Sequence, residues 1–172
     1  TYDITYNDEW SEAFLFGSWS RTAVNLSGYK GIRVVMDKAY GNKLQLKIYG
    51  DKKSGTNYNE QYVTLSEDSE TTTAVFDTSI LGSTFWGVTL QTNSGATTAT
   101  LKEAKLIKAD DTEESLSATA AWGCTVEAKS TPKPTGIHAI KYVKSEDDGA
   151  IYNLQIARSE ERRVGNECRS RW

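Results

Sequence analysis

The stretch that decides the fold reads IRVVMDKAYGNKLQLKIY and covers residues 32–49. Apolar and polar residues alternate in each half of it, and the apolar positions are Ile32, Val34, Met36, Leu44, Leu46 and Ile48. A period of two is typical of strands with one buried face. Between the halves, residues 40–43 include Gly-Asn, which supplies the positive φ angles of a tight turn. The stretch therefore predicts two antiparallel strands joined as a hairpin.

The strand pattern continues along the chain in both directions. Six further segments are rich in β-branched and aromatic residues, namely 2–6, 12–17, 60–65, 72–77, 86–92 and 97–108. Turn residues separate these segments at short spacing, and only 113–122 has the composition of a helical turn. Eight short strands at this spacing predict an all-β fold, an antiparallel β-sandwich or barrel.

Strand parity assigns residues to the two faces of the predicted sheets. The apolar residues Leu44, Leu46, Ile48, Val88 and Leu90 require burial, which stabilises by roughly 1.5–3 kcal/mol for each large side chain. Successive side chains point to opposite faces of a strand. The opposite face therefore carries Gln45, Lys47, Tyr49, Thr89 and Gln91. Such a mixture of amides and an aromatic is unlike both a fully solvated face and an apolar core.

Composition and charge exclude two classes of protein. The chain has 172 residues, 38% of them hydrophobic and 25% charged, as a globular domain with some extension would have. No apolar run approaches the roughly 18 residues of a membrane-spanning helix, so we expect no membrane insertion. Residues 1–156 carry 15 basic and 20 acidic side chains, a net charge of −5. Without a basic stripe, this charge predicts no nucleic-acid partner.

The domain boundaries are predicted from shifts in composition. An acidic cluster at 110–114 ends the strand-rich part, and small polar residues and a linker with Pro132 and Pro134 follow. We expect a β-sandwich module at 1–114 and a linker with a partial C-terminal extension at 115–156. Because the chain starts at Thr1 without an apolar leader, we expect a mature or excised segment of a longer protein.

Catalytic and metal chemistry find little support in the sequence. The only histidine, His138, lies beyond the proline linker, and the two cysteines, Cys124 and Cys168, fit neither a zinc site nor a disulfide framework. Most acidic residues lie in predicted turns, and no glycine-rich phosphate loop opens a helix. We therefore predict no enzyme, no catalytic residue, no metal ligand and no cofactor. A structural calcium ion held by loop carbonyls leaves no linear signature, so that alternative stays open.

Binding is the class of function with positive signals. Sugar sites combine a flat aromatic ring with planar amide or guanidinium groups. Residues of these types that face away from the predicted core, or lie near turns, are the candidate ligand-binding residues Trp19, Arg33, Gln45, Tyr49 and Gln91. Tyr49 fits a core role equally well, whereas Phe76 and Trp86 are assigned to the core because Trp86 is in phase with Val88. A mixed face of this kind also suits a protein interface.

At this point the chain resembles a known family. Trp19 followed by VNLSGYKGIRV at 24–34 is similar to a segment of galactose-binding-like jelly-roll modules. Residues 85–91 (FWGVTLQ) and 101–107 (LKEAKLI) resemble two late strands of the same modules. These are carbohydrate-binding-module-like β-sandwiches in secreted proteins of glycan-foraging Gram-negative bacteria. The resemblance covers about 1–114 and implies a jelly-roll sandwich whose ligand lies on the concave sheet, at Arg33, Gln45, Tyr49 and Gln91.

The C-terminal part resembles two further things. Residues 134–137 and 148–155, which end in YNLQ, are similar to the start of a C-terminal segment common in such secreted proteins, and the similarity stops after Gln155. The last 16 residues carry five Arg and three Glu, a net charge of +2, and resemble a vector-derived read-through. We therefore interpret 157–172 as a non-native basic tail, with a natural tail as the alternative.

These observations predict a non-catalytic carbohydrate-binding module of a secreted or cell-surface bacterial protein. Its expected partner is a polysaccharide or oligosaccharide, and we expect a monomer linked to a catalytic domain in the full-length protein. The alternative is a structural spacer or protein-interaction β-sandwich without a glycan ligand.

Overall fold

The computed structural model describes residues 1–37, 43–66, 68–129, 140–144 and 151–156. The chain divides into two units, Thr1–Lys129 and Ser130–Trp172. In the second unit, the described strands β14 (Ile140–Lys144) and β15 (Ile151–Ile156) pair antiparallel. The linker prolines, His138, Cys168 and the tail at 157–172 lie outside the described residues.

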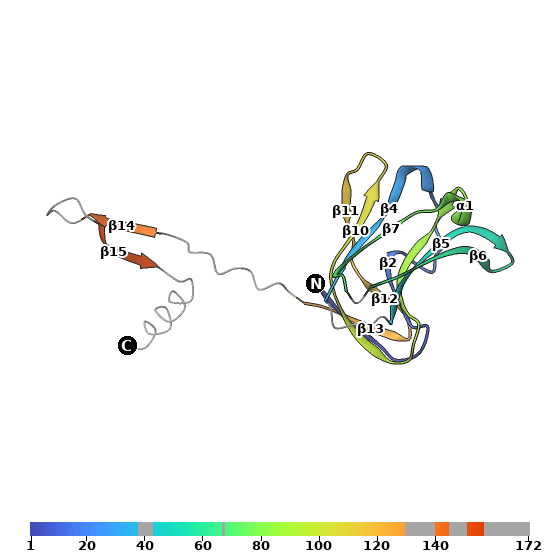
Figure 1. The fold of residues 1–172 in the computed structure, drawn as a ribbon, viewed down its shortest axis with the longest axis horizontal. Helices are drawn as coiled ribbons and strands as arrows, with labels where there is room; N and C mark the ends of the chain where they lie inside the picture. The colour runs from blue at the N-terminus through green and yellow to red at the C-terminus, as the bar shows by residue number, and fades with distance from the viewer. Residues whose placement is uncertain (38–42, 67, 130–139, 145–150, 157–172) are drawn as a thin grey trace, which may run out of the picture. The chain divides into compact units, whose positions relative to one another are not determined.

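Two antiparallel sheets form the first unit (Figure 1). Sheet 1 has the order β13 (Cys124–Ala128), β1 (Tyr2–Tyr6), β10 (Thr97–Lys108), β4 (Tyr29–Met36) and β7 (Thr71–Val75), and β11 (Glu113–Ser115) pairs with β10. Sheet 2 has the order β12 (Thr119–Trp122), β2 (Glu12–Gly17), β9 (Gly87–Thr92), β5 (Leu44–Ser54) and β6 (Asn57–Thr64). The short elements are β3 (Val24–Asn25), which pairs with β8 (Thr84–Phe85), η1 (Leu26–Gly28) and α1 (Thr78–Leu81). The predicted all-β antiparallel sandwich is confirmed.

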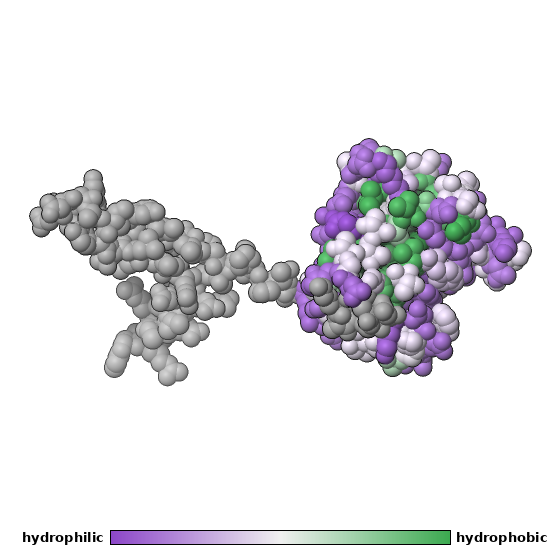
Figure 2. Space-filling view, viewed as in Figure 1, coloured by the Kyte–Doolittle hydropathy of each residue, from purple (hydrophilic) through white to green (hydrophobic). Residues whose placement is uncertain are grey.

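The hydrophobic core lies between the two sheets, as the alternation predicts. Sheet 1 contributes Ile4, Ile32, Val34, Met36, Leu101 and Leu106, and sheet 2 contributes Leu44, Leu46, Ile48, Val88 and Leu90, all fully buried. The Tyr6 hydroxyl crosses the core from β1 and donates to the Leu90 carbonyl at 3.1 Å. Burial raises the pKa of Tyr6 well above its usual value, so this hydroxyl remains a donor. Outside the core, Figure 2 shows small hydrophobic patches scattered among hydrophilic residues on one face, as on an ordinary domain surface.

The hairpin predicted around residues 40–43 is wrong. β4 pairs with β10 and β7 in sheet 1, whereas β5 pairs with β9 and β6 in sheet 2. Both strands bury their apolar side in the same core, but they approach it from opposite sheets. Alternation alone does not separate these arrangements, because either one buries the same residues. A tight hairpin does join β5 to β6, and Gly55 takes the positive φ of 53° there.

The sandwich extends beyond the boundary predicted at 114. β12 adds to the edge of sheet 2 beside β2, and β13 adds to the edge of sheet 1 beside β1. Backbone pairing thus holds the chain in the first unit up to Lys129. The predicted helical turn at 113–122 is replaced by β11 and β12. These strands have short, mostly exposed sequences, so no apolar alternation marked them.

Candidate functional site

The outer face of sheet 2 is unusually buried for the outside of a sandwich. The Glu12 side chain is only 6% exposed, and its carboxylate accepts hydrogen bonds from the Tyr49 hydroxyl at 2.8 Å and from the Thr89 hydroxyl at 2.8 Å. Burial, and then the negative charge of Glu12, raise the pKa of Tyr49. The phenol therefore stays protonated and donates. This contact fixes the Tyr49 ring in one position on the sheet.

Gln45 and Gln91 lie on the same face, as parity predicts. The Gln45 side-chain amide donates to the Gln91 side-chain oxygen at 2.8 Å, and the Gln91 amide donates to the Trp10 carbonyl at 3.3 Å. Both side chains are buried. Their hydrogen-bonding groups are therefore engaged within the protein, and they hold the sheet together rather than facing solvent.

A cluster of aromatic rings occupies the other end of this face. The Tyr49 ring stacks on Trp86 with the centroids 4.4 Å apart, and Phe14 lies against Trp86 at 6.3 Å. Gly87 makes room for them, because a Cβ atom there would lie 3.2 Å from Phe14 Cε1 and 3.5 Å from Tyr49 Cδ2. The sequence thus builds a layer of clustered rings, the aromatic floor, over a glycine.

Trp86 is buried, as predicted, but not in the core between the sheets. It precedes β9 and packs with Phe14 and Tyr49 on the outer face, whereas its neighbour Phe85 packs into the main core. The prediction that Trp86 belongs to the core, made because it is in phase with Val88, is therefore wrong. The alternation holds only within β9, which begins at Gly87, so it does not extend back to residue 86.

The aromatic floor continues into an open hollow of about 340 Å³. Three separate segments line it: the loop after β2, the β5–β6 hairpin and the residue before β9. The lining residues, called the aromatic hollow below, are Trp19, Arg21, Tyr49, Lys53, Ser54, Thr56, Asn57, Tyr58, Glu60 and Trp86. Trp19 is 47% exposed, and Tyr58 meets Trp86 edge-on with the ring centroids 5.1 Å apart. Aromatic surfaces are thus open to a ligand here.

A strained turn presents Trp19 and Arg21 to the hollow. Gly17 has a φ of 76°, and a Cβ atom there would lie 2.0 Å from the Trp86 carbonyl oxygen, so only glycine fits. The Arg21 backbone N–H donates to the Ser18 carbonyl at 3.0 Å, and Arg21 itself has a φ of 56°. A left-handed conformation costs a residue with a side chain about 1 kcal/mol or more. The surrounding contacts hold it in place.

Arg21 and Trp86 both have hydrogen-bond donors without a partner among the described residues. The Arg21 guanidinium carbon lies 5.2 Å from the centroid of the Tyr58 ring and 5.7 Å from that of Trp86. Trp86 is only 2% exposed, yet its Nε1 has no hydrogen-bond partner among the described residues. An unpaired buried N–H is costly, by about 1–3 kcal/mol.

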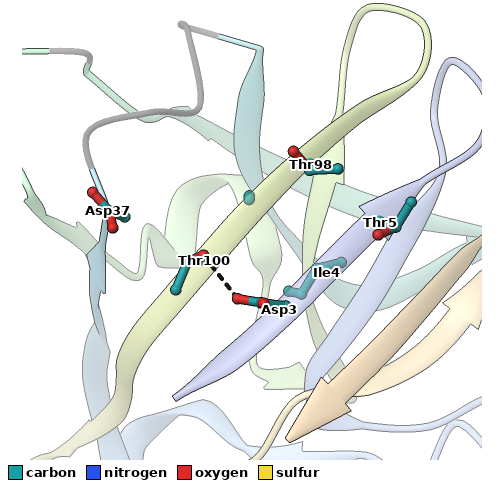
Figure 3. A pocket seen from close by; sticks show the side chains of 7 residues that line it. Asp3, Ile4, Thr5, Asp37, Thr98 and Thr100 are labelled. Carbon is teal, nitrogen blue, oxygen red and sulfur yellow. Dashed lines mark hydrogen bonds between the residues drawn. The ribbon is translucent and has the colours of Figure 1, made fainter. Parts of the chain in front are cut away.

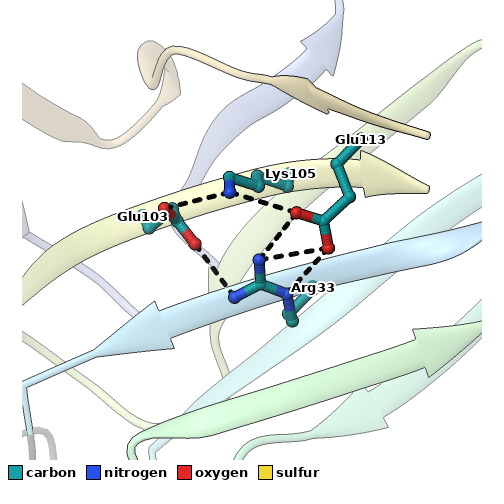
Figure 4. Close-up of polar contacts among 4 residues, drawn as sticks. All are labelled: Arg33, Glu103, Lys105 and Glu113. Atoms are coloured by element: carbon teal, nitrogen blue, oxygen red, sulfur yellow. Dashed lines mark hydrogen bonds and ion pairs between the residues drawn. The ribbon is translucent and has the colours of Figure 1, made fainter.

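Arg33, by contrast, is separated from the other predicted residues. It lies on β4 in sheet 1, where its guanidinium donates to Glu113 at 2.9 Å and to Glu103 at 2.9 Å (Figure 4). Lys105 bridges the same two carboxylates at 3.0 and 3.4 Å. Hydrogen bonds from Arg33 and Lys105 lower the pKa of Glu113. The guanidinium is thus saturated by protein carboxylates, and it ties β11 to β4.

A second hollow lies on the outer side of sheet 1, between β1 and β10, and has a volume of about 310 Å³ (Figure 3). Asp3 points to Thr100 there and accepts its hydroxyl at 2.8 Å. Asp3 also pairs with Lys129, whose hydrogen bond is the main cause of the lowered pKa of Asp3. Because this carboxylate is already satisfied and no aromatic ring of the described residues lines the hollow, its chemistry suits a sugar less well.

Of the five predicted binding residues, the structure brings Trp19 and Tyr49 together in the aromatic hollow. Gln45 and Gln91 share that face but do not line the hollow, and Arg33 is on the opposite sheet. Sequence reasoning missed Arg21, Tyr58 and Trp86. The sequence signal for Trp86 was the Phe85–Trp86–Gly87 triplet. Adjacent residues of an extended chain point to opposite faces of the sheet, so the two rings cannot both pack into the same core. Nothing in the sequence pairs Arg21 with Tyr58.

Other chemistry was also sought among the described residues. No group of three or more His, Cys, Asp and Glu side chains in that part of the chain is placed to hold a metal ion. The Cys124 thiol donates to the Glu12 carbonyl at 3.1 Å. None of the described helices is long and apolar enough to cross a membrane.

Comparisons with known proteins add no relative. Scanning protein-family models and searching curated proteins and solved structures gave no match to this chain. The aromatic hollow must therefore be interpreted from its own chemistry.

Proposed function

We propose that the first unit is a non-catalytic carbohydrate-binding module and that a polysaccharide or oligosaccharide binds in the aromatic hollow. The observation that carries the proposal is the combination of open aromatic surface at Trp19 and Tyr58 with the unpartnered indole N–H of Trp86. Apolar faces of sugar rings pack on aromatic rings, and their hydroxyls need donors and acceptors around the rim. Both requirements are met by neighbouring residues.

The rim supplies polar groups of the right types. Asn57 offers an amide and Arg21 a guanidinium, and both line the hollow beside the rings. The rings themselves are held by protein contacts, since Tyr49 is hydrogen-bonded to Glu12 and the Trp19 indole donates to the Ala121 carbonyl at 3.3 Å. A site held in place before binding loses less entropy when the ligand arrives.

The wider setting of the proposal follows the resemblance noted in the sequence. We infer a jelly-roll, galactose-binding-like module of a secreted or surface bacterial protein, monomeric, without a cofactor and linked to a catalytic domain in the full-length chain. The all-β sandwich is compatible with this setting. The sugar site proposed here replaces Arg33, Gln45 and Gln91 with Arg21, Tyr58 and Trp86 and keeps Trp19 and Tyr49.

A glycan array tests the proposal, with titrations extended to about millimolar concentrations because open sites bind weakly. We expect a glycan to bind and its affinity to fall at least about tenfold in Trp19→Ala and Tyr58→Ala. Trp122→Ala is the matched control, because Trp122 is 53% exposed and does not line the hollow. Absence of binding to every glycan, or equal losses in all three variants, would contradict the proposal.

A protein-binding or spacer module is the second candidate. It is favoured by Trp10 and Trp122, which are 50% and 53% exposed outside the hollow. Large exposed aromatic residues are typical of protein interfaces. If this candidate is correct, Trp10→Ala and Trp122→Ala should abolish binding to a partner protein. The wild-type protein and Trp19→Ala should then both bind no glycan on the array.

A further inference from the structure

We propose that the glycan held in the aromatic hollow is acidic and that its carboxylate or sulfate group pairs with Arg21 and Lys53. This inference rests on the proposed function and names the class of ligand. It follows from the balance of charges around the hollow, which favours an anion although the domain as a whole is acidic.

Two cations line the hollow without an anionic partner. Neither Arg21 nor Lys53 forms an ion pair with any described residue, although both are exposed beside the rings. Elsewhere on this unit, several cations that are just as exposed do form ion pairs, such as Lys30 with Asp111 and Lys108 with Glu114. Among the described basic side chains, Lys43 and Lys52 are unpaired as well, but only Arg21 and Lys53 of the unpaired ones line the hollow.

Among the described residues, the one carboxylate that lines the hollow is already neutralised. Glu60 pairs with Lys47, whose Nζ lies 3.1 Å from its carboxylate oxygen, and Glu60 also accepts the Tyr62 hydroxyl. The Lys47 side chain is only 14% exposed, and its Nζ lies 4.5 Å from the centroid of the Tyr49 ring. The pair is thus partly shielded from water, and it cancels one negative charge. Among the residues that line the hollow, Arg21 and Lys53 then carry the uncompensated charge, whereas the Glu12 carboxylate lies behind Tyr49 and does not line it.

Arg21 is available to an anion. Its guanidinium carbon lies 5.2 and 5.7 Å from the centroids of the Tyr58 and Trp86 rings, and none of its side-chain N–H groups has a partner among the described residues. These N–H groups can donate to a carboxylate or a sulfate. The nearby aromatic faces would hold the sugar ring that carries this group. The site would then recognise the sugar ring and its charged group together.

Matched pairs of glycans test the inference. One pair is an oligogalacturonate and its fully methyl-esterified form, and the other is a sulfated galactan fragment and its desulfated form, which is neutral. A series of neutral xylo- and manno-oligosaccharides completes the set. We expect an acidic member to bind and its neutralised counterpart to bind about tenfold or more weakly. The pair that shows this difference identifies the anion as carboxylate or sulfate. Binding should also weaken when salt is raised from about 0.05 M to about 0.5 M.

Variants separate the site from general attraction. Arg21→Gln and Lys53→Gln should each weaken binding of the acidic glycan, by roughly tenfold for Arg21. Lys43→Gln removes the same charge just before β5, at the end opposite Lys53, and should have little effect. Melting temperatures confirm that the variants fold.

Each outcome decides one claim. If only neutral glycans bind and Trp19→Ala still weakens them, the acidic ligand is wrong but the proposed function stands. If no glycan binds at all, both are wrong. If an acidic glycan binds and Lys43→Gln weakens it as much as Arg21→Gln, the assignment to Arg21 and Lys53 is overturned.

Discussion

The outer faces of the two sheets obey the same alternation, yet they differ in kind. On sheet 1, Arg33, Lys105, Glu103 and Glu113 form a network of ion pairs open to water. On sheet 2, Glu12, Tyr49 and Thr89 form a buried hydrogen-bonded group beside stacked rings. These four charged groups of the first face satisfy one another. The second face ends in a hollow whose donors are unsatisfied, and because of this difference we propose sheet 2 as the functional face.

The largest expected effect is on the buried group of sheet 2. Glu12→Ala removes the acceptor for the Tyr49 and Thr89 hydroxyls and leaves both buried without a partner. We expect the free energy of unfolding to fall by about 3 kcal/mol. Urea denaturation measures this loss. Glu12→Gln, which retains one oxygen acceptor, should lose less, and equal losses in the two variants would count against the hydrogen-bond explanation.

A smaller effect is expected at the glycine beneath the rings. In Gly87→Ala the added Cβ atom would lie 3.2 Å from Phe14 and press on Tyr49. We expect a loss of about 1–2 kcal/mol in unfolding free energy and weaker glycan binding, because the floor of the hollow shifts. Gly28→Ala is the control, since a Cβ atom there meets nothing within 4 Å. Unchanged stability in Gly87→Ala would show that the Phe14 and Tyr49 rings can move aside without cost, which would contradict this prediction.

The dependence of stability on acid reports on Asp51, near the hairpin end of sheet 2. Its carboxylate accepts hydrogen bonds from the side chains and backbone N–H groups of Thr84 and Ser83, which lower its pKa to about 2. The usual value in an unfolded chain is about 3.9. Because the folded pKa is the lower one, this contribution is complete above about pH 4 and is lost as the pH falls towards 2.

Asp51→Asn should therefore flatten the fall in stability between about pH 4 and pH 2. Urea midpoints measured across that range for the wild type and the variant provide the comparison. A fall of equal steepness in both proteins would show that other carboxylates, Glu113 among them, account for the acid sensitivity.

The smallest effect is expected on sheet 1. Arg33→Gln breaks ion pairs that are open to water, so the midpoint of unfolding should change by only a small fraction of the Glu12→Ala change. Glycan binding should not change, because Arg33 lies on the other sheet. A loss of binding in Arg33→Gln would reverse the comparison and restore the site expected from sequence alone.

Much of the fold could be predicted from local pattern. The alternation at Ile32–Met36 and Leu44–Ile48 located two strands and their buried sides, because burial of apolar side chains acts through the period of the strand itself. It did not reveal that these strands belong to different sheets. Pairing between strands depends on contacts distant in sequence, and either arrangement buries the same residues.

The candidate site was harder to predict than the fold. Trp19 and Tyr49 could be chosen because exposure near a turn and phase along a strand are local properties. Trp86 was misplaced because strand parity stops at Gly87, and Arg21 meets Tyr58 only after 36 intervening residues have folded back. A site assembled from three loops has no period in the sequence.

The most direct test of the central claim follows the tryptophan indole N–H signals by NMR during a titration with the glycan that the array identifies. We predict that the Trp19 and Trp86 signals shift, because both side chains line the hollow. The signals of Trp10 and Trp122, which do not line the hollow, should stay in place. Shifts confined to Trp10 and Trp122, with Trp19 and Trp86 unchanged, would contradict binding in the aromatic hollow.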